Sequence, residues 1–442
     1  MINKLQFKFE YIFSYLKKNI VFLLIGLTLG SSVFVFWHRI YFFFSSPAFK
    51  TKKIGIEGLY KENSLPPEIN QHITLNLITT SENNRISASP LIQEMKISPD
   101  YKTYTFTLSK AIWHDGTLLT SSDIKLNLGD ANLEIIDQNQ FKIITPNPYS
   151  PLLSILAKPL YKKNLIGLGP YKVSGIDYRD GYIKTIKLLP QTPNDPSLTY
   201  RFYPNEQDLI TAFKLGEVDQ IRSSFLPEEL SHWPKITINQ KVETNTTFSA
   251  IFLNNEKLNI KQIRQALAYA TPKVKTKNER CLGPISPDSW AYNPQIKEYN
   301  YNPERAIELM EDNKIESISL IVIDRRLLFQ AEEIKKTWKE VLNIDVAITV
   351  ENQPDIQNYD AILSFRPIPL DPDQYLYWHS TQTKTNLTKT NNSRIDKLLE
   401  EGRQIMDQQE RKIIYQDFQR YLLEECPAIF LSFPTSYTII KS

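Results

Sequence analysis

The longest uninterrupted apolar stretch of the sequence lies close to the N-terminus. Residues 20–37, IVFLLIGLTLGSSVFVFW, carry no charged side chain. A helix needs about 20 apolar residues to cross a bilayer, whereas the apolar core of a cleaved signal peptide spans about 7–15. The pattern therefore predicts a transmembrane helix over 18–44, between an interfacial segment (1–17) and a linker (45–53). A cleaved signal peptide is the alternative.

The rest of the chain alternates between strand-like and helix-like patterns. Apolar residues that alternate or run together predict strands at 53–60, 104–108, 141–145, 171–173, 183–189, 248–253, 317–323, 344–350 and 429–433. Apolar residues spaced by three or four predict helices at 66–78, 207–215, 260–269, 303–310, 331–342, 395–406 and 411–425. The strand–helix–strand order over 317–350 implies a parallel pair with a right-handed crossover. We therefore expect an α/β protein with at least two lobes.

Composition and charge exclude several classes of protein. Hydrophobic residues make up 41% and charged residues 23%, as in ordinary globular domains. Five of the 52 Lys and Arg residues, but one of the 49 acidic residues, lie within 1–44. The body is therefore close to neutral and does not favour nucleic acid as a partner. With two cysteines, a disulfide scaffold or a cysteine-rich metal cluster is excluded, while pairing of Cys281 with Cys426 stays open.

Several segments resemble one protein family, and they occur in its order. They are ISPDYKTYTFTLSKAIWHDG (97–116), IGLGPYKV (166–173), LITAFKLGEVDQI (209–221), FLNNEKLNIKQIRQALAYA (252–270), DPD (371–373) and the helix pair over 395–431. Together they resemble the extracytoplasmic solute-binding proteins of ABC transporters, specifically the oligopeptide/dipeptide/nickel-binding family, family 5. The resemblance covers most of residues 54–435.

The resemblance implies a two-lobed periplasmic-binding-protein-like fold of type II, cluster C. Lobe I would comprise 54–245 plus 428–442, and lobe II 246–427, with the chain crossing near 243–250 and returning near 425–430. The stretch between Asp123 and Phe141 is short for the family, which suggests a reduced accessory subdomain. A ligand would bind in the cleft between the lobes, and the lobes would close around it.

The resemblance also places ligand contacts in the 365–379 segment. The expected ligand-binding residues are Arg366, Asp371, Asp373, Tyr375, Trp378, Trp290 and Asn254. Relatives that bind peptides often hold the free amine with an aspartate a few residues before the acidic-proline element, but 365–370 contains no acid. Arg366 could hold a carboxylate instead, so the ligand would be gripped by its C-terminus or lack a free amine. The alternative is that Arg366 forms an ion pair with Asp371 or Asp373.

Candidate chemistry elsewhere in the chain has simpler structural explanations. His114 and Asp115 within WHDG fit a turn better than an acid–base pair. The sequence has no G-x-S-x-G element and no phosphate loop, so we expect no enzyme activity, cofactor or metal. Binding of a nickel complex through His379 is a minor alternative within the family. Arg264, beside the apolar stripe of the helix over 260–269, is expected to be structural.

The leading hypothesis is a membrane-anchored, monomeric solute-binding protein with its N-terminus in the cytoplasm and its body outside. It would deliver a peptide or similar small polar solute to an ABC permease and its ATPase subunits. A surface adaptor or sensor that keeps the fold without uptake is the main alternative. A surface hydrolase is a weaker one, because the sequence offers no nucleophile–base pair.

Overall fold

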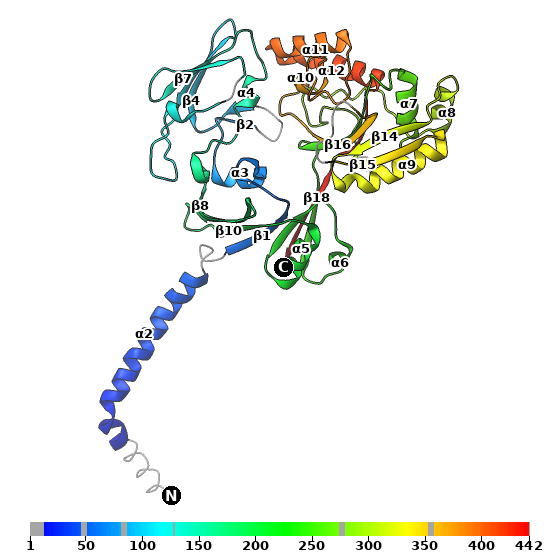
Figure 1. Ribbon diagram of the computed structural model, residues 1–442. Helices are drawn as coiled ribbons and strands as arrows, with labels where there is room; N and C mark the ends of the chain where they lie inside the picture. Colours follow the sequence, from blue (N-terminus) through cyan, green and yellow to red (C-terminus); the bar gives the residue numbers. More distant parts are fainter. Residues whose placement is uncertain are drawn as a thin grey trace.

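The computed structural model describes residues 13–45, 51–80, 86–126, 129–273, 279–351 and 358–441. Its body contains a seven-stranded sheet, a five-stranded sheet, a four-stranded sheet and a two-stranded ribbon. In Figure 1 the five-stranded sheet and its helices lie on one side of the body, the four-stranded sheet lies on the other, and the seven-stranded sheet lies below them. The α/β prediction is confirmed.

The seven-stranded sheet has the order β12-β18-β11-β1-β10-β9-β8. Its strands are β1 (Thr51–Glu57), β8 (Tyr171–Arg179), β9 (Tyr182–Pro190), β10 (Ser197–Tyr203), β11 (Gln220–Ser223), β12 (Ile236–Val242) and β18 (Thr435–Lys441). Asp180 and Gly181 both have positive φ, which is the geometry that a two-residue hairpin between β8 and β9 requires. Helix α5 (Glu206–Leu215) ends at Gly216, whose φ of 78° is the left-handed cap expected there.

The four-stranded sheet has the order β4-β5-β7-β6 and stands apart from the larger sheet. Its strands are β4 (Ile92–Ile97), β5 (Thr103–Leu108), β6 (Asn132–Ile135) and β7 (Gln140–Ile144), and β2 (Ile78–Thr80) pairs with β3 (Ile86–Ala88) nearby. Phe106 and Phe141 stack in its core at a centroid distance of 5.0 Å. Whether this part is reduced relative to the family stays a prediction.

The five-stranded sheet has the order β15-β14-β16-β13-β17. Its strands are β13 (Thr247–Leu253), β14 (Ser317–Val322), β15 (Asp345–Val350), β16 (Ala361–Pro367) and β17 (Ala428–Ser432). Strands β14 and β15 are parallel and are linked by helix α9 (Leu328–Leu342), so the predicted strand–helix–strand unit is confirmed. Trp338, from α9, is fully buried against this sheet.

Helices cover both faces of the five-stranded sheet. They are α7 (Lys261–Ala270), α8 (Pro303–Met310), α9, α10 (Tyr375–Trp378), α11 (Ser393–Gln404) and α12 (Gln408–Glu425). Of the four residues that form the apolar stripe, Ile263, Leu267 and Ala270 are buried, while Ile260 is 39% exposed just before the helix. Arg264 is buried and donates to the main-chain carbonyls of Leu258, Asn259 and Glu425. This agrees with the structural role expected for Arg264.

Two short segments join the large sheets, and we call 243–246 and 433–434 the crossing segments. The first connects β12 to β13, and the second connects β17 to β18. They run together, because the Glu243 N–H donates to the Pro434 carbonyl at 2.9 Å. Since β17 pairs with β13, the chain returns at 433–434, later than the expected 425–430. The other lobe boundaries stay a prediction.

Helix α3 (Pro67–Ile73) is shorter than expected, because it ends at Thr74. Leu77 and Ile78 continue the apolar pattern, but they belong to the core under the four-stranded sheet. Strands β2, β3, β4, β6, β10, β11, β12 and β18 are additions to the predicted elements. The remaining short elements are α4 (Leu152–Ile155), α6 (Glu228–Ser231), and the 3-10 turns Glu62–Ser64, Ser121–Asp123, Lys163–Leu165 and Arg325–Leu327.

Helix α2 (Ile20–Ser45) extends away from the body in Figure 1. Its described apolar side chains are exposed, Phe22 by 75% and Phe34 by 81%. Among the described residues, which leave out several side chains of this segment, no helix is both long and apolar enough to cross a membrane. The interfacial segment expected over 1–17 lies mostly outside the described residues.

Candidate ligand-binding site

Three cavities meet around the loop at 280–298, beside the crossing segments. We call them the neutral cavity, the hinge cavity and the small cavity. The neutral and hinge cavities share Ile285 as a lining residue. The hinge and small cavities share Arg280, Leu282 and Glu298. A ligand placed here would therefore touch the joint between the two large sheets.

The neutral cavity encloses about 620 Å³, part of it open to solvent. It is lined by Asn245, Ile285, Ser286, Ser289, Ile368, Pro369, Leu370, Pro372 and Gln374. These residues come from a crossing segment, from the 280–298 loop and from the chain that follows β16. The main chain holds these parts together, because the Ile368 N–H donates to the Thr246 carbonyl at 2.9 Å.

Most polar groups in the wall of the neutral cavity are already bonded within the protein. The Ser286 hydroxyl donates to Asn245 Oδ1 at 2.6 Å, and Asn245 Nδ2 donates to Asp288 at 3.0 Å. Gln374 donates to the Pro284 carbonyl and accepts from Trp378 Nε1. The wall therefore combines apolar surface with uncharged polar groups, most of which already have partners within the protein.

The hinge cavity is larger, about 1420 Å³ including its open part. Its lining includes Val242, Thr244 and Phe433, from the crossing segments or beside them. It also contains charges of both signs, from Arg280, Asp288 and Glu298. This cavity can accommodate a polar or charged solute.

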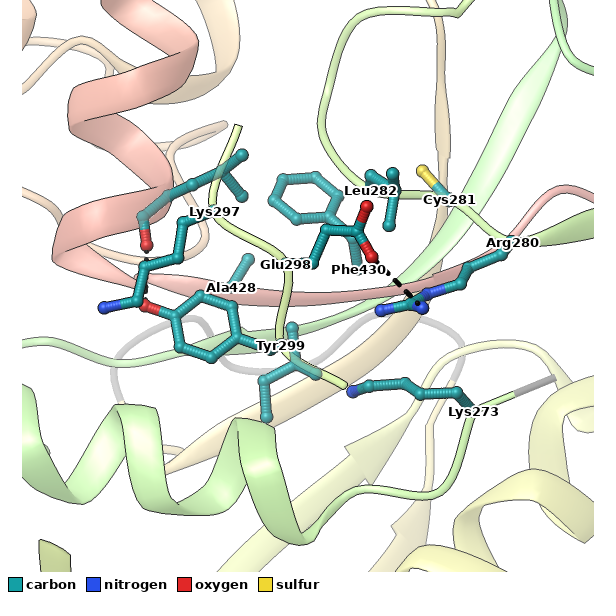
Figure 2. Close-up of a pocket in the computed structure, with 11 residues that line it drawn as sticks. Lys273, Arg280, Cys281, Leu282, Lys297, Glu298, Tyr299, Ala428 and Phe430 are labelled. Carbon is teal, nitrogen blue, oxygen red and sulfur yellow. Dashed lines mark hydrogen bonds and ion pairs between the residues drawn. The ribbon is translucent and has the colours of Figure 1, made fainter. Parts of the chain in front are cut away.

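The small cavity encloses about 290 Å³ and is lined by three cationic side chains, Lys273, Arg280 and Lys297 (Figure 2). Arg280 lies 3.6 Å from Glu298, and Lys297 lies 3.2 Å from Glu424, so two of the cations have acidic partners. Burial lowers the pKa of Lys273 to about 7, and its ammonium donates to the Ala268 carbonyl at 3.1 Å. Its size and its paired charges make it a weaker candidate for a solute site.

The first acid of the 365–379 segment, Asp371, is part of the scaffold. Its two carboxylate oxygens accept from Nη1 and Nη2 of Arg411, on α12, at 3.1 and 2.6 Å. The two side chains are 5% and 7% exposed. Arg411 Nε donates to the Gly402 carbonyl and thereby ties α12 to α11.

The second acid, Asp373, has a less favourable cationic partner. Arg403 Nε lies 3.2 Å from Asp373 Oδ2 but is not aligned for a hydrogen bond. Burial raises the pKa of Asp373, although the nearby guanidinium of Arg403 opposes this shift. Arg403 also stacks on Tyr375 at 4.1 Å and donates to the Tyr149 hydroxyl at 3.0 Å. This arginine therefore connects the 365–379 segment to the loop after β7.

Arg366 has neither of the two acidic partners that the sequence suggested. Its guanidinium lies between the rings of Phe252 and Tyr377, at 5.0 and 4.5 Å. One of its N–H groups donates to the Thr385 carbonyl at 3.1 Å. The proposed ion pair with Asp371 or Asp373 is wrong, because those acids pair with Arg411 and Arg403. Burial lowers the pKa of the Arg366 guanidinium.

The remaining predicted residues take part in packing. Trp378 is 1% exposed and lies in the core, 6.0 Å from the ring of Phe430. Asn254 is also 1% exposed, and its amide donates to the Tyr359 carbonyl at 2.9 Å. Trp290 packs edge-on against Tyr415 at 6.4 Å.

Among the described residues, none of the seven predicted ligand-binding residues lines these three cavities. Their immediate neighbours do, namely Ile368, Pro369, Leu370, Pro372 and Gln374. Sequence reasoning selected the charged and aromatic members of the 365–379 segment, whereas its uncharged members line the neutral cavity. It also missed Arg403 and Arg411, whose partners lie far away in the sequence. A role of the seven residues in binding stays a prediction.

Other candidate groups have structural partners. His114 contacts the Gly169 carbonyl at 2.9 Å, and Asp115 accepts from the Thr117 N–H at 3.0 Å, as expected for a turn. His379 lies 3.2 Å from Glu400. Within the described ranges, no group of three or more His, Cys, Asp or Glu residues is arranged to hold a metal ion.

The two cysteines do not form a disulfide. Cys281 and Cys426 are both buried and free. They belong to different hydrophobic clusters of the same lobe, and burial raises the pKa of the Cys426 thiol to about 11. The pairing that the sequence left open is therefore absent from this structure.

Comparison with known proteins identifies bacterial solute-binding proteins as relatives of this chain. The sequence model described as "Bacterial extracellular solute-binding proteins, family 5 Middle" matches residues 128–386. The oligopeptide-binding protein AppA of Bacillus subtilis is 23% identical over 390 residues, covering 77% of this chain and 70% of AppA. The family model covers the first crossing segment and the whole of the 365–379 segment.

Two solved structures have the same fold. NikZ from Campylobacter jejuni, in complex with Ni(L-His), superposes with a TM-score of 0.73 at 21% identity, covering 89% of this chain and 94% of NikZ. DppA from Helicobacter pylori, in complex with the peptide STSA, gives a TM-score of 0.72 at 18% identity, with the same two coverages. Proteins of this fold thus bind quite different solutes.

Proposed function

The chain belongs to family 5 of the bacterial extracellular solute-binding proteins, and from this premise we propose that it captures a peptide or a similar small polar solute. The observation that carries the proposal is the family match over 128–386, which includes the first crossing segment and most of the cavity wall. The solute would occupy the neutral and hinge cavities, where both large sheets can contact it. Closure of the two lobes would then enclose it.

The proposal also covers the delivery of the solute and the location of the protein. The loaded protein would pass its solute to an ABC permease, with its ATPase subunits supplying the energy. Helix α2, with its exposed apolar side chains, would anchor the body to the outer face of the membrane, and the N-terminus would remain in the cytoplasm. The body would act as a monomer. No chemical step is assigned to this chain.

Binding can be tested with thermal unfolding and titration calorimetry. We expect a random tripeptide mixture to raise the melting temperature of the protein, because a ligand at about 100 times its Kd stabilises by about 2.7 kcal/mol. Ser289→Trp, which places a large side chain in the neutral cavity, should abolish this shift. Ser231→Trp, on helix α6 outside the three cavities, is the matched control and should keep it.

The outcome also separates the two functional candidates. A shift that disappears in Ser289→Trp and persists in Ser231→Trp supports capture of a peptide. If no peptide changes the melting temperature of the unmodified protein, the adaptor or sensor alternative takes precedence. The anchor is tested separately, by the intact mass of membrane-extracted protein. Loss of roughly the first 45 residues, as for a cleaved signal peptide, would contradict it.

A further inference from the structure

We propose that the neutral cavity receives an uncharged, apolar end of the ligand, so that a peptide with a blocked amine is preferred over one with a free amine. This inference rests on the proposed function and specifies the class of solute. All nine residues that line the cavity are uncharged, and Ile285, Ile368, Pro369, Leu370 and Pro372 form its apolar part. Such a surface suits an acyl cap or another neutral group.

The two acids of the 365–379 segment, Asp371 and Asp373, are not available to an ammonium group. Both oxygens of Asp371 accept from Arg411, and one of them also accepts from the Asp373 N–H at 3.0 Å. Asp373 accepts from the Tyr375 N–H at 3.0 Å and lies against Arg403. An ammonium group would have to displace an arginine from either acid. Without such displacement, it would be desolvated in the neutral cavity without a carboxylate partner.

The wall offers few hydrogen-bond acceptors in place of a carboxylate. The Asn245 carbonyl oxygen accepts from Ser286, and the Gln374 carbonyl oxygen accepts from Trp378. The Ser286 oxygen accepts from the Asp288 N–H at 3.1 Å. An ammonium group has three donors to satisfy, whereas an acylated nitrogen has one. The arrangement therefore favours the ligand whose nitrogen has lost its charge.

Asp288 is the rival site for a free amine. It lines the adjacent hinge cavity and is exposed, although its Oδ2 already accepts from Thr244 and Asn245. A peptide could in principle direct its amine there and leave the neutral cavity empty. The proposal therefore makes a second prediction: Asp288→Asn should leave the preference for the blocked peptide unchanged.

The test measures Kd by calorimetry for trialanine and N-acetyl-trialanine on the full chain. We expect the acetylated peptide to bind at least about tenfold more tightly, because it avoids an unpaired buried charge. Leu370→Asp, which introduces a carboxylate at the partly exposed wall of the neutral cavity, should reverse this preference. Leu376→Asp adds the same charge on α10, outside the cavity, and should leave the preference unchanged. Ser289→Asp is a second cavity variant, which serves if Leu370→Asp does not fold.

Each outcome decides between the proposals. Tighter binding of trialanine than of the acetylated peptide would overturn the inference and leave peptide capture intact. Equal affinities would do the same, and so would a changed preference between the two peptides in Asp288→Asn, because Asp288 would then hold the amine. If neither peptide binds, and the random tripeptide mixture also fails to stabilise the protein, the proposed function fails and the inference fails with it.

Discussion

The two halves of the 365–379 segment use different chemistry, although they are continuous in sequence. From 371 onward, the two acids are held by arginines, Asp371 by Arg411 on α12 and Asp373 by Arg403 on α11, although the uncharged Pro372 and Gln374 also line the cavity. Between 368 and 370, apolar side chains line a cavity beside the crossing segments. The comparison shows that the charged side chains of a candidate binding loop can serve to hold the loop in place, while its uncharged residues line the cavity.

The largest expected effect comes from breaking the buried ion pair. Arg411→Ala should lower the free energy of unfolding by about 3–5 kcal/mol, because Asp371 would remain buried without a counter-charge. Arg420→Ala, on the same helix, removes an ion pair with Asp417 in which the side chains are 53% and 41% exposed. That control should cost less than about 1 kcal/mol. Urea unfolding of both variants measures the difference.

A similar cost for Arg411→Ala and Arg420→Ala would contradict the assignment of Asp371 to the scaffold. Peptide affinity per folded molecule should be unchanged in both variants. A selective loss of affinity in Arg411→Ala, with unchanged stability, would instead place Asp371 in the ligand site.

The sequence could predict most elements whose pattern is local. The unit β14-α9-β15 is recognisable because its strands and helix each have a clear period, and α5 ends where Gly216 allows a left-handed residue. The end of α3 was missed because Leu77 and Ile78 extend its apolar pattern into another core. Strand β18 was missed because its burial comes from pairing with β11 and β12, which are about 200 residues away in sequence.

The candidate site depended on contacts that the sequence does not display. Arg411 is 40 residues from Asp371, so no spacing rule connects them. The residues that line the neutral cavity, such as Ile285 and Pro369, are ordinary loop residues, and only the fold brings them together. Family resemblance supplied the segment, and physical packing determined which of its members face the cavity.

A smaller loss of stability is expected from replacing Arg403, which contacts the 365–379 segment beside the neutral cavity. Arg403→Ala should lower the free energy of unfolding by about 1–2 kcal/mol, because it removes a hydrogen bond to Tyr149, stacking on Tyr375 and the poorly aligned ion pair with Asp373. Arg394→Ala, on the same helix, removes a cation–π contact with Tyr421 and should cost about 0.5–1 kcal/mol. Equal costs would show that the link to Tyr149 contributes little.

The smallest expected effect is a change in pH dependence from Asp373. Because burial raises its pKa in the folded state, the native protein binds more protons than the unfolded chain at pH values just above 3.8. Asp373 should therefore make stability fall as pH rises through the window between the unfolded and folded pKa values. Asp373→Asn should remove this slope, while Asp417→Asn should not. An unchanged slope in Asp373→Asn would contradict the effect of burial.

The central claim is that Asp371 and Asp373 hold the loop in place while residues 368–370 contact the ligand. Its most direct test is a crystal structure of the full chain with N-acetyl-trialanine. We predict that the acetyl group contacts Ile368 and Leu370 within about 4 Å. Asp371 and Asp373 should keep Arg411 and Arg403 as their partners. A ligand nitrogen bonded to either carboxylate, with its arginine displaced, would contradict the account.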